Sequence, residues 1–429
     1  MYFKKKSSSI VKAILGILLV VVLVAIIGQV YAFFHPGYSN IILDPDPVIG
    51  WKFAPNIEFV HTGNNWYADE LSVHHKTNFF GFLGPDRPFK KPADTARVVL
   101  MGDSFVEALQ VSRNLSAAGV LDRQLNDLAG SGSMPFQHYE VLNFGVSNLS
   151  VGQYLLIWEQ YASKFSPDYV FIFVTGVQMN RTTQKKADWG MQKGQISRPS
   201  FELVNKKLIR HPVENYSEAV QIFNEEIQSR GGRTKKREQK IWIIDWVKSG
   251  DMSRVFKSLV PLKMRLAVKQ FVVGEDTIKP IIPALKERIL QFIKPSEYKK
   301  EIEGSEPVKQ KNTEKLELSE DTLQVNLSVI EELNKKIAKN GGKLIVVDAS
   351  LYFWFMGAND ILTKRIHDFC ENKGIFYIPL YKDLLETDKN NIWARFPHSY
   401  HFNEHGNAVF AHSMLEWIKA DAPLKTGNK

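Results

Sequence analysis

Short apolar runs separated by helix-length segments constrain the fold more than any other feature of this sequence. Residues 169–174 are all apolar, with no alternation between apolar and polar positions. The strand that they predict must therefore be buried on both faces. Further strands are predicted at residues 97–101, 139–144, 343–347 and 375–378, and helices at 114–129, 151–165, 320–339, 363–373 and up to 420. Strands joined in this way form parallel sheets through right-handed crossovers. We therefore predict an α/β fold, a flavodoxin-like three-layer α/β/α sandwich with about five parallel strands.

The 429 residues exceed what such a core needs, and the pattern divides them. Residues 97–182 and 320–420 carry the alternation and are predicted to be the two halves of one domain. Residues 183–319 interrupt it and predict a basic, largely helical insertion that packs on the core, with a membrane surface or a partner as alternative contacts. Residues 35–96, rich in Pro, Gly, Asn and aromatic residues, predict a strand-and-loop segment whose paired His74-His75 is expected to pack or to be exposed. Residues 421–429 form a short tail.

The N-terminus has the pattern of a membrane anchor. Residues 1–9 are polar and basic, and residues 10–34 are almost wholly apolar, which is long enough for the roughly 20 residues of a spanning helix. The lysines at positions 4–6 predict a cytoplasmic N-terminus, so we expect a single-pass protein with a periplasmic or extracellular body. A signal peptide cleaved after Ala32 is the alternative.

The net charge of the chain indicates which classes of binding partner suit it. Fifty-five Lys and Arg against 46 Asp and Glu give a formal net charge of +9. This charge suits an anionic membrane face or a polyanionic polymer, and no nucleic-acid-binding motif accompanies it. The single cysteine, Cys370, excludes a disulfide within the chain.

The tripeptide Gly102-Asp103-Ser104 follows the first predicted strand. In open α/β sheets ligands bind at the carboxyl ends of the strands, and a serine there lies among helix N-terminal amides that can hold an oxyanion. Ser104 is therefore a candidate nucleophile. The alternative is that Ser104 or Asp103 only caps a helix.

Three more polar blocks occupy corresponding positions along the chain. Residues 143–148 follow the second strand, residues 175–180 follow the third, and His401 precedes the final helix, for which Asn403 is the predicted N-cap. Because the carboxyl ends of parallel strands share one edge of the sheet, these blocks are expected to meet there.

With these four blocks in this order, the chain resembles the SGNH hydrolases, the GDSL-type family of serine esterases, lipases and carbohydrate O-acyl esterases. The resemblance covers roughly residues 97–182 and 320–420. It implies that Ser104 is the nucleophile and His401 the base that removes its proton. It also implies an oxyanion hole made by the backbone amide of Ser104 and by groups of Asn148, Gln178 and Asn180.

Two departures from the family pattern concern the oxyanion hole. Asn148 stands where the family usually has glycine, so it is expected to adopt the backbone dihedral of that glycine, which asparagine tolerates better than most residues. In the third block Gln178 lies closest to the usual asparagine position, and Asn180 follows two residues later. Either amide can donate to an oxyanion.

A third departure concerns the acid that normally orients the catalytic histidine. The family places Asp two or three residues before that histidine, where this chain has Ser399 and His398. A backbone carbonyl, His398, Asp348 or Asp360 could take over this role. Loss of the acid can cost about 10⁴-fold in rate, so a slow enzyme or a degenerate binding module are both open.

Metal binding has a weaker basis. His398, His401 and His405 offer three ligands, but the base role already accounts for His401 and no metalloprotease motif is present. We expect no metal and no cofactor.

The leading hypothesis is a membrane-anchored, extracytoplasmic serine esterase or O-acyltransferase, similar to the SGNH domains of polysaccharide O-acetyltransferases. It would act on acyl esters, O-acetyl esters first among them, of an envelope glycan or lipid, with envelope biosynthesis proteins as partners. The alternative is a catalytically degenerate protein of this fold that binds a glycan or a partner.

Overall fold

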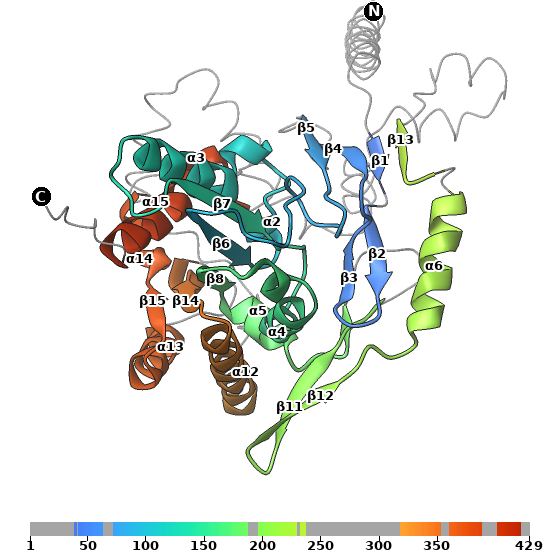
Figure 1. Cartoon of the computed structure of the whole chain (residues 1–429). Helices are drawn as coiled ribbons and strands as arrows, with labels where there is room; N and C mark the ends of the chain where they lie inside the picture. Colours follow the sequence, from blue (N-terminus) through green and yellow to red (C-terminus); the bar gives the residue numbers. More distant parts are fainter. Residues whose placement is uncertain are drawn as a thin grey trace, which may run out of the picture. The chain divides into compact units, whose positions relative to one another are not determined.

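A computed structural model gives the fold and describes residues 38–40, 42–62, 72–187, 196–229, 232–236, 318–352, 360–387 and 401–421. The chain divides into two compact units, residues 1–39 with 235–308 and residues 40–234 with 309–429. The short strands β1 (Tyr38–Asn40) and β13 (Thr234–Lys236) pair with each other. All other described elements belong to the second unit (Figure 1).

A sheet of five parallel strands forms the centre of the second unit, in the order β15-β14-β8-β6-β7. The strands are β6 (Thr95–Met101), β7 (His138–Asn143), β8 (Tyr169–Val174), β14 (Lys343–Asp348) and β15 (Phe376–Ile378). Val99 of β6 lies opposite Leu142 of β7 on one side and Val170 of β8 on the other. Numbered along the chain the order is 2-1-3-4-5, which is the flavodoxin-like order. The prediction of a three-layer fold with five parallel strands is confirmed.

Helices cover both faces of this sheet, because successive strand residues point to opposite sides. Val98 and Leu100 belong to one core, and Val99 and Met101 to the other. The first core is covered by α3 (Ala117–Gly130), α14 (Leu380–Thr387) and α15 (Glu404–Asp421). The second is covered by α4 (Val151–Gln160), α12 (Glu320–Lys339) and α13 (Asp360–Lys373). Figure 1 shows these two groups of helices on opposite sides of the sheet.

Polar caps fix where the helices begin. Ser150 and Gln153 form a capping box at α4, and Asn403 caps α15 by accepting the backbone N–H of Gly406 at 3.0 Å. The helix predicted from residue 114 starts later, because the Ser116 side chain accepts the N–H of Gly119 and caps α3. The residues just before it form the short 3₁₀ helix η1 (Arg113–Leu115).

The segment before β6 packs onto the second core, as a strand-and-loop element. It contains the hairpins β2 (Leu43–Asp46) with β3 (Gly50–Phe53) and β4 (Glu58–Thr62) with β5 (Ser72–Lys76). Trp51 and Phe53 of β3 are fully buried in the same cluster as Phe82 and Phe144. Burial of each such side chain contributes roughly 1.5–3 kcal/mol.

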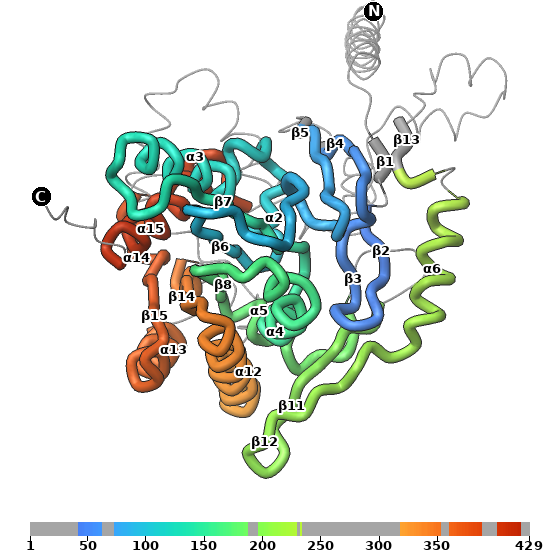
Figure 2. The backbone as a smooth tube through the Cα atoms, viewed as in Figure 1, coloured from blue at the N-terminus to red at the C-terminus, as the bar shows by residue number. Residues whose placement is uncertain are grey.

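The described part of the insertion differs from the predicted, largely helical one. It contains one helix, α6 (Tyr216–Ser229), but two hairpins precede this helix. These are β9 (Lys186–Ala187) with β10 (Ile196–Ser197), and β11 (Ser200–Val204) with β12 (Lys207–His211), the second of which Figure 2 shows beside α12. Its two-residue turn, Asn205-Lys206, has φ of 49° and 63°, the positive values that a tight hairpin turn requires. Residues 237–317 lie outside the described part.

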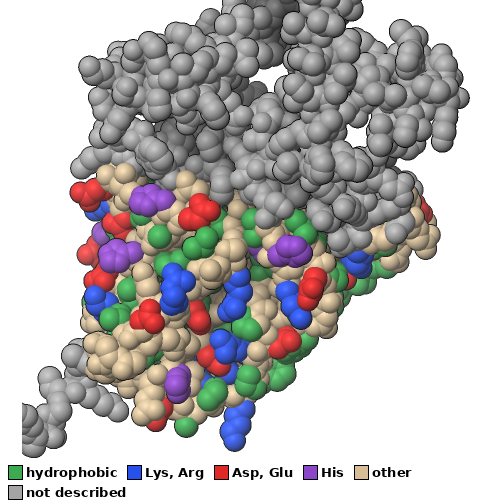
Figure 3. All heavy atoms as spheres, turned by 90° about the horizontal axis from the view of Figure 1, so that it is seen from above, with side chains coloured by type: hydrophobic (Ala, Val, Ile, Leu, Met, Phe, Trp, Pro, Cys, Tyr) green, Lys and Arg blue, Asp and Glu red, His purple; other side chains and the backbone are tan. Residues whose placement is uncertain are grey.

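The predicted anchor, residues 10–34, and the basic tail before it also lie outside the described residues. Within the described ranges, no helix is both long enough and apolar enough to cross a bilayer. On the face seen in Figure 3, the described residues carry basic and acidic side chains interspersed.

Candidate active site

Ser104 is the first residue of the short helix α2 (Ser104–Glu107), directly after β6. Asp103 caps this helix, its carboxylate accepting the N–H of Phe105 at 3.2 Å. The cap predicted as an alternative role for Asp103 is therefore present, and it leaves the Ser104 hydroxyl available. The loop after β7 reaches α2 through Gly145, where a Cβ would lie 2.3 Å from the backbone nitrogen of Glu107. Only glycine permits this approach.

His401 meets Ser104 at the carboxyl edge of the sheet. Its Nε2 lies 2.8 Å from Oγ of Ser104, and both residues are half-buried. The ring of Phe105 lies beside the imidazole, with centroids 5.1 Å apart. In the sheet, β6 lies between β7 and β8. The chain connects β6 to β7 over one face of the sheet and β7 to β8 over the other face, so this edge is the topological switch point. A neutral Nε2 at this distance can accept the serine proton as the oxygen attacks a carbonyl carbon.

Asn148 adopts the conformation expected for the glycine that it replaces. Its φ is 63°, in the left-handed region. The side chain oxygen accepts a hydrogen bond from Nη2 of Arg198 at 3.2 Å, and the preceding residue, Ser147, is held through its carbonyl by Nε1 of Trp51 at 3.0 Å. Glu107 also accepts the N–H of Ser147 at 3.0 Å and its hydroxyl. Three side chains, those of Arg198, Trp51 and Glu107, therefore hold this loop through hydrogen bonds.

The third block forms α5 (Gly176–Arg181), which carries both candidate amides. Gln178 is fully buried, its Oε1 accepts the hydroxyl of Thr175, and its Nε2 has no hydrogen-bond partner among the described residues. Asn180 is half-buried, and its backbone carbonyl accepts the Thr183 hydroxyl at 3.5 Å. Of the two candidates, Gln178 thus has a buried amide donor that no described residue uses.

The structure does not bring the proposed acids to His401. Asp348 is fully buried at the end of β14 and accepts the N–H of Ser350 and the hydroxyl of Tyr377, each at 2.8 Å. Burial raises the pKa of this carboxyl. Asp360 is exposed at the start of α13, and no contact between described residues joins either acid to His401. His398 lies outside the described residues.

Two arginines near the nucleophile were not predicted from the sequence. Nη1 of Arg181, on α5, lies 3.0 Å from Oδ2 of Asp103 and 3.4 Å from the carbonyl oxygen of Leu149. Arg198, between β10 and β11, is buried, and its guanidinium lies 5.2 Å from the ring centroid of Trp51. The two guanidinium groups thus contact Asp103, the residue before the candidate nucleophile, and Asn148 of the second block.

Two histidines of the β4–β5 hairpin also lie near the site. Burial lowers the pKa of His61 to about 4, with smaller contributions from His75 and His401. His61 is therefore neutral near pH 7. His75 is buried, with Nε2 2.9 Å from the carbonyl oxygen of Leu109. No local sequence pattern marks His61, because its neighbours come from distant segments.

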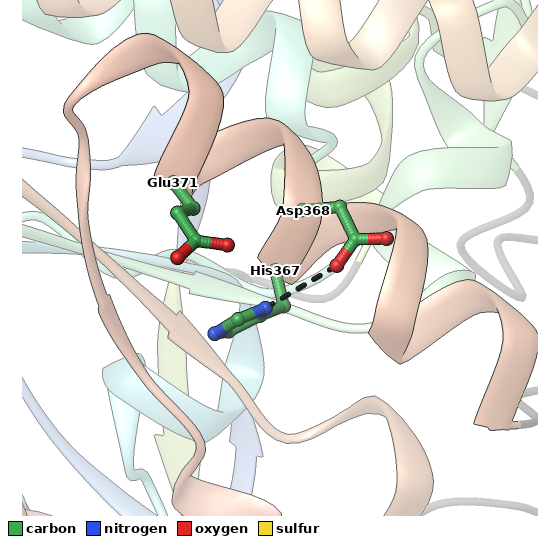
Figure 4. A group of neighbouring side chains, drawn as sticks. All are labelled: His367, Asp368 and Glu371. Carbon is green, nitrogen blue, oxygen red and sulfur yellow. Dashed lines mark hydrogen bonds and ion pairs between the residues drawn. The ribbon is translucent and has the colours of Figure 1, made fainter.

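The histidines considered for a metal site do not assemble among the described residues. Nε2 of His401 faces Ser104, and His405 is exposed in the first turn of α15. Figure 4 shows a different group, His367, Asp368 and Glu371, along one helix, α13. Asp368 is also 3.6 Å from Lys364 and half-exposed, so this group has the character of a solvated helix face.

No family model and no curated protein matches the sequence. Among solved structures, an acetylxylan esterase from Geobacillus stearothermophilus is similar at 10% identity, with 75% of this chain and 94% of that chain covered and a TM-score of 0.35. A member of the lipolytic G-D-S-L family from Veillonella parvula has 12% identity, coverage of 75% and 97%, and a TM-score of 0.31. An alpha/beta hydrolase from the metagenome of Lake Arreo, Spain, has 11% identity, coverage of 77% and 97%, and a TM-score of 0.35.

Proposed function

We propose that this protein is a serine-dependent acyl-ester hydrolase or O-acyltransferase. The observation that carries the proposal is the 2.8 Å contact between Oγ of Ser104 and Nε2 of His401 at the switch point of the sheet. A helix cap or a purely structural serine does not require a histidine nitrogen in this position. We assign the oxyanion hole to the backbone amide of Ser104, to Asn148 with its left-handed backbone, and to Gln178 with its unused amide donor.

The arrangement supports acyl transfer in two steps. Oγ of Ser104 attacks the ester carbonyl carbon while Nε2 of His401 takes the hydroxyl proton. The oxyanion that forms accepts hydrogen bonds from backbone amides of Ser104 and Asn148 and from Nε2 of Gln178. The imidazolium then gives its proton to the leaving alcohol, which leaves an acyl-serine. Water or a second hydroxyl, deprotonated by His401, attacks this ester. The bond from the acyl carbon to Oγ breaks, the imidazolium returns the proton to Oγ of Ser104, and the carboxylic acid or the new ester leaves.

The location and the substrate belong to the proposal as well. The apolar residues 10–34, preceded by lysines, support a single-pass protein whose body lies outside the cytoplasm. The net charge of +9 supports an anionic surface or polymer nearby. We expect acyl esters, O-acetyl esters first among them, of an envelope glycan or lipid, with envelope biosynthesis proteins as partners.

A fluorophosphonate probe tests the proposal directly, because it labels only an activated serine. The full-length chain in detergent is labelled as wild type, Ser104→Ala and His401→Ala, with the exposed Ser133→Ala as a matched control. We expect labelling of the wild type and of Ser133→Ala and its loss in the other two. A folded wild type that stays unlabelled would replace this proposal with a degenerate binding module. Acetate release with and without an added sugar acceptor then separates hydrolysis from transfer.

A further inference from the structure

The two buried arginines of the described chain differ in how their charge is satisfied. Arg97 of β6 donates from Nε to Glu140 at 2.7 Å, and its other two nitrogens donate to backbone carbonyls of Pro88, Phe89 and Phe165. Arg198 is 2% exposed, yet only its Nη2 has a partner, the neutral amide oxygen of Asn148. Its Nε and Nη1 have none among the described residues. An uncompensated buried cation costs several kcal/mol, so this arrangement calls for an anion.

Among the described residues, no ion pair joins Arg198 to an acid. Trp51 lies against the guanidinium, and the charge that affects Arg198 is the cation of Arg181. Burial, and then the charge of Arg181, lower the pKa of Arg198 to about 9, which still leaves it charged at neutral pH. Asp103, one of the acids at this end of the sheet, is paired with Arg181. Arg198, Arg181 and Asp103 together carry a formal charge of +1.

Arg198 also contacts a residue of the proposed oxyanion hole. Its Nη2 reaches the side chain of Asn148, whose backbone amide is a proposed oxyanion donor. Asn148 is half-buried, so this residue is partly open to solvent. Its amide oxygen is neutral, and a carboxylate that reached Nη2 would be the stronger acceptor.

We propose that Arg198 binds a carboxylate on the acyl-bearing substrate, so that the site selects O-acylated saccharides that carry a sugar acid. This inference rests on the proposed function and adds its substrate class. The planar guanidinium matches a carboxylate, and a single unpaired positive charge matches a monoanion. A phosphate monoester, with nearly two negative charges, would need a second free cation, and Arg181 is committed to Asp103.

The test compares two substrates that differ only in charge. One is a chemically O-acetylated oligogalacturonate, and the other is the same oligomer with its carboxylates methyl-esterified. Release of acetate by the full-length chain gives kcat/KM for each. We expect the wild type to prefer the acidic oligomer by about 10- to 100-fold, the range for a charge-assisted contact. We expect Arg198→Gln to bring this ratio close to one through KM, and Arg198→Lys to retain part of it.

Lys207→Gln is the matched control, because it removes one positive charge from an exposed position in the same insertion. We expect its ratio to equal that of the wild type. A wild-type ratio near one overturns the inference, and this arm needs no variant to fold. Equal losses on both substrates in Arg198→Gln also overturn it, since they would show that Arg198 only braces the loop at Asn148.

A binding experiment separates this inference from the proposed chemistry. Calorimetry of Ser104→Ala with the acetylated oligogalacturonate needs no turnover. If Ser104→Ala binds the oligomer, loses this binding when Arg198→Gln is added, and the wild type stays unlabelled by the fluorophosphonate probe, the anion site is supported and the enzyme is rejected. Labelling by the probe without such binding rejects the anion site alone.

Discussion

Oδ2 of Asp103 lies 3.0 Å from Nη1 of Arg181, and this ion pair joins the residue before the candidate nucleophile to the helix that follows β8. The Asp103 side chain is 3% exposed and the Arg181 side chain 23%. The same carboxylate caps α2. One side chain therefore sets both the start of the serine helix and its position relative to α5.

Asp103→Asn tests the weight of this pair. Asparagine can still cap α2, but it leaves Arg181 without its partner, so we expect a loss of about 2 kcal/mol in the free energy of unfolding. Asp103→Ala, which also removes the cap, should lose about 1 kcal/mol more. Urea unfolding measures both. The control is Arg210→Gln, which breaks an exposed pair with Glu159 and should cost less than about 1 kcal/mol. Equal losses in Asp103→Asn and Arg210→Gln would contradict the prediction.

Glu107 should make the stability of the protein fall as pH rises. Burial raises its pKa from 4.5 to about 7, against the opposing effect of its hydrogen bonds from Ser147. Below pH 4.5 the carboxyl is protonated in the folded and the unfolded chain. Between pH 4.5 and 7 only the unfolded chain loses the proton, so the free energy of unfolding decreases by about 3 kcal/mol in all. Above pH 7 both states are ionised and this contribution stays constant.

Glu107→Gln removes this titration. The difference in unfolding free energy, wild type minus Glu107→Gln, should fall between pH 4.5 and 7 and be level outside that window. Urea titrations from pH 4 to 9 give the difference. The exposed Glu371→Gln is the matched control for the removal of one carboxylate. A level difference for Glu107→Gln would mean that Glu107 ionises at its ordinary pKa in the folded protein.

The left-handed backbone at Asn148 is tested by a pair of variants. Asn148→Gly and Asn148→Ala both lose the hydrogen bond from Arg198, so the comparison isolates the backbone. At a φ of 63° we expect the glycine variant to be more stable by about 1 kcal/mol. We also expect the glycine variant to hydrolyse p-nitrophenyl acetate faster than the alanine variant, because the proposed donor is the backbone amide. A more stable alanine variant would refute the assigned conformation.

Asn407 holds the helix that follows His401. It is fully buried, accepts the N–H of Ala117 at 2.9 Å and donates to the carbonyls of Phe402 and Asn403. Asn407→Leu leaves these groups unpaired and should cost about 2–4 kcal/mol in unfolding free energy. The exposed Asn340→Leu should cost less than about 1 kcal/mol. Thermal unfolding of both variants at one pH measures the two losses. Equal losses would contradict a structural role for Asn407.

Local patterns were enough to predict the sheet, and the resemblance to the SGNH hydrolases added the pairing of Ser104 with His401. Apolar runs mark the strands, caps such as Ser150 and Asn403 mark the helices, and parallel topology then brings the strand ends to one edge. The first strand was predicted from Arg97 but begins two residues earlier, at Thr95. In the sequence, a charged residue indicates the end of a buried strand. In the structure, Arg97 lies inside the strand and is buried against Glu140.

The remaining features depend on contacts between distant segments. Asp348 ends a strand at the right edge, but Tyr377 of the neighbouring strand binds its carboxylate. Nothing near Arg198 in the chain indicates that Trp51 and Asn148 surround it. The hairpins of the insertion depend on positive φ at Asn205 and Lys206, and a single sequence does not specify these dihedrals.

The candidate nucleophile and its base are separated by 297 residues of chain. At 5–20 residues per second, the ribosome finishes the histidine roughly 15–60 s after the serine. During that interval the growing polypeptide holds an ordinary serine. Because His401 directly precedes α15, which packs on α3, a chain that ends before residue 401 lacks the histidine that contacts this serine.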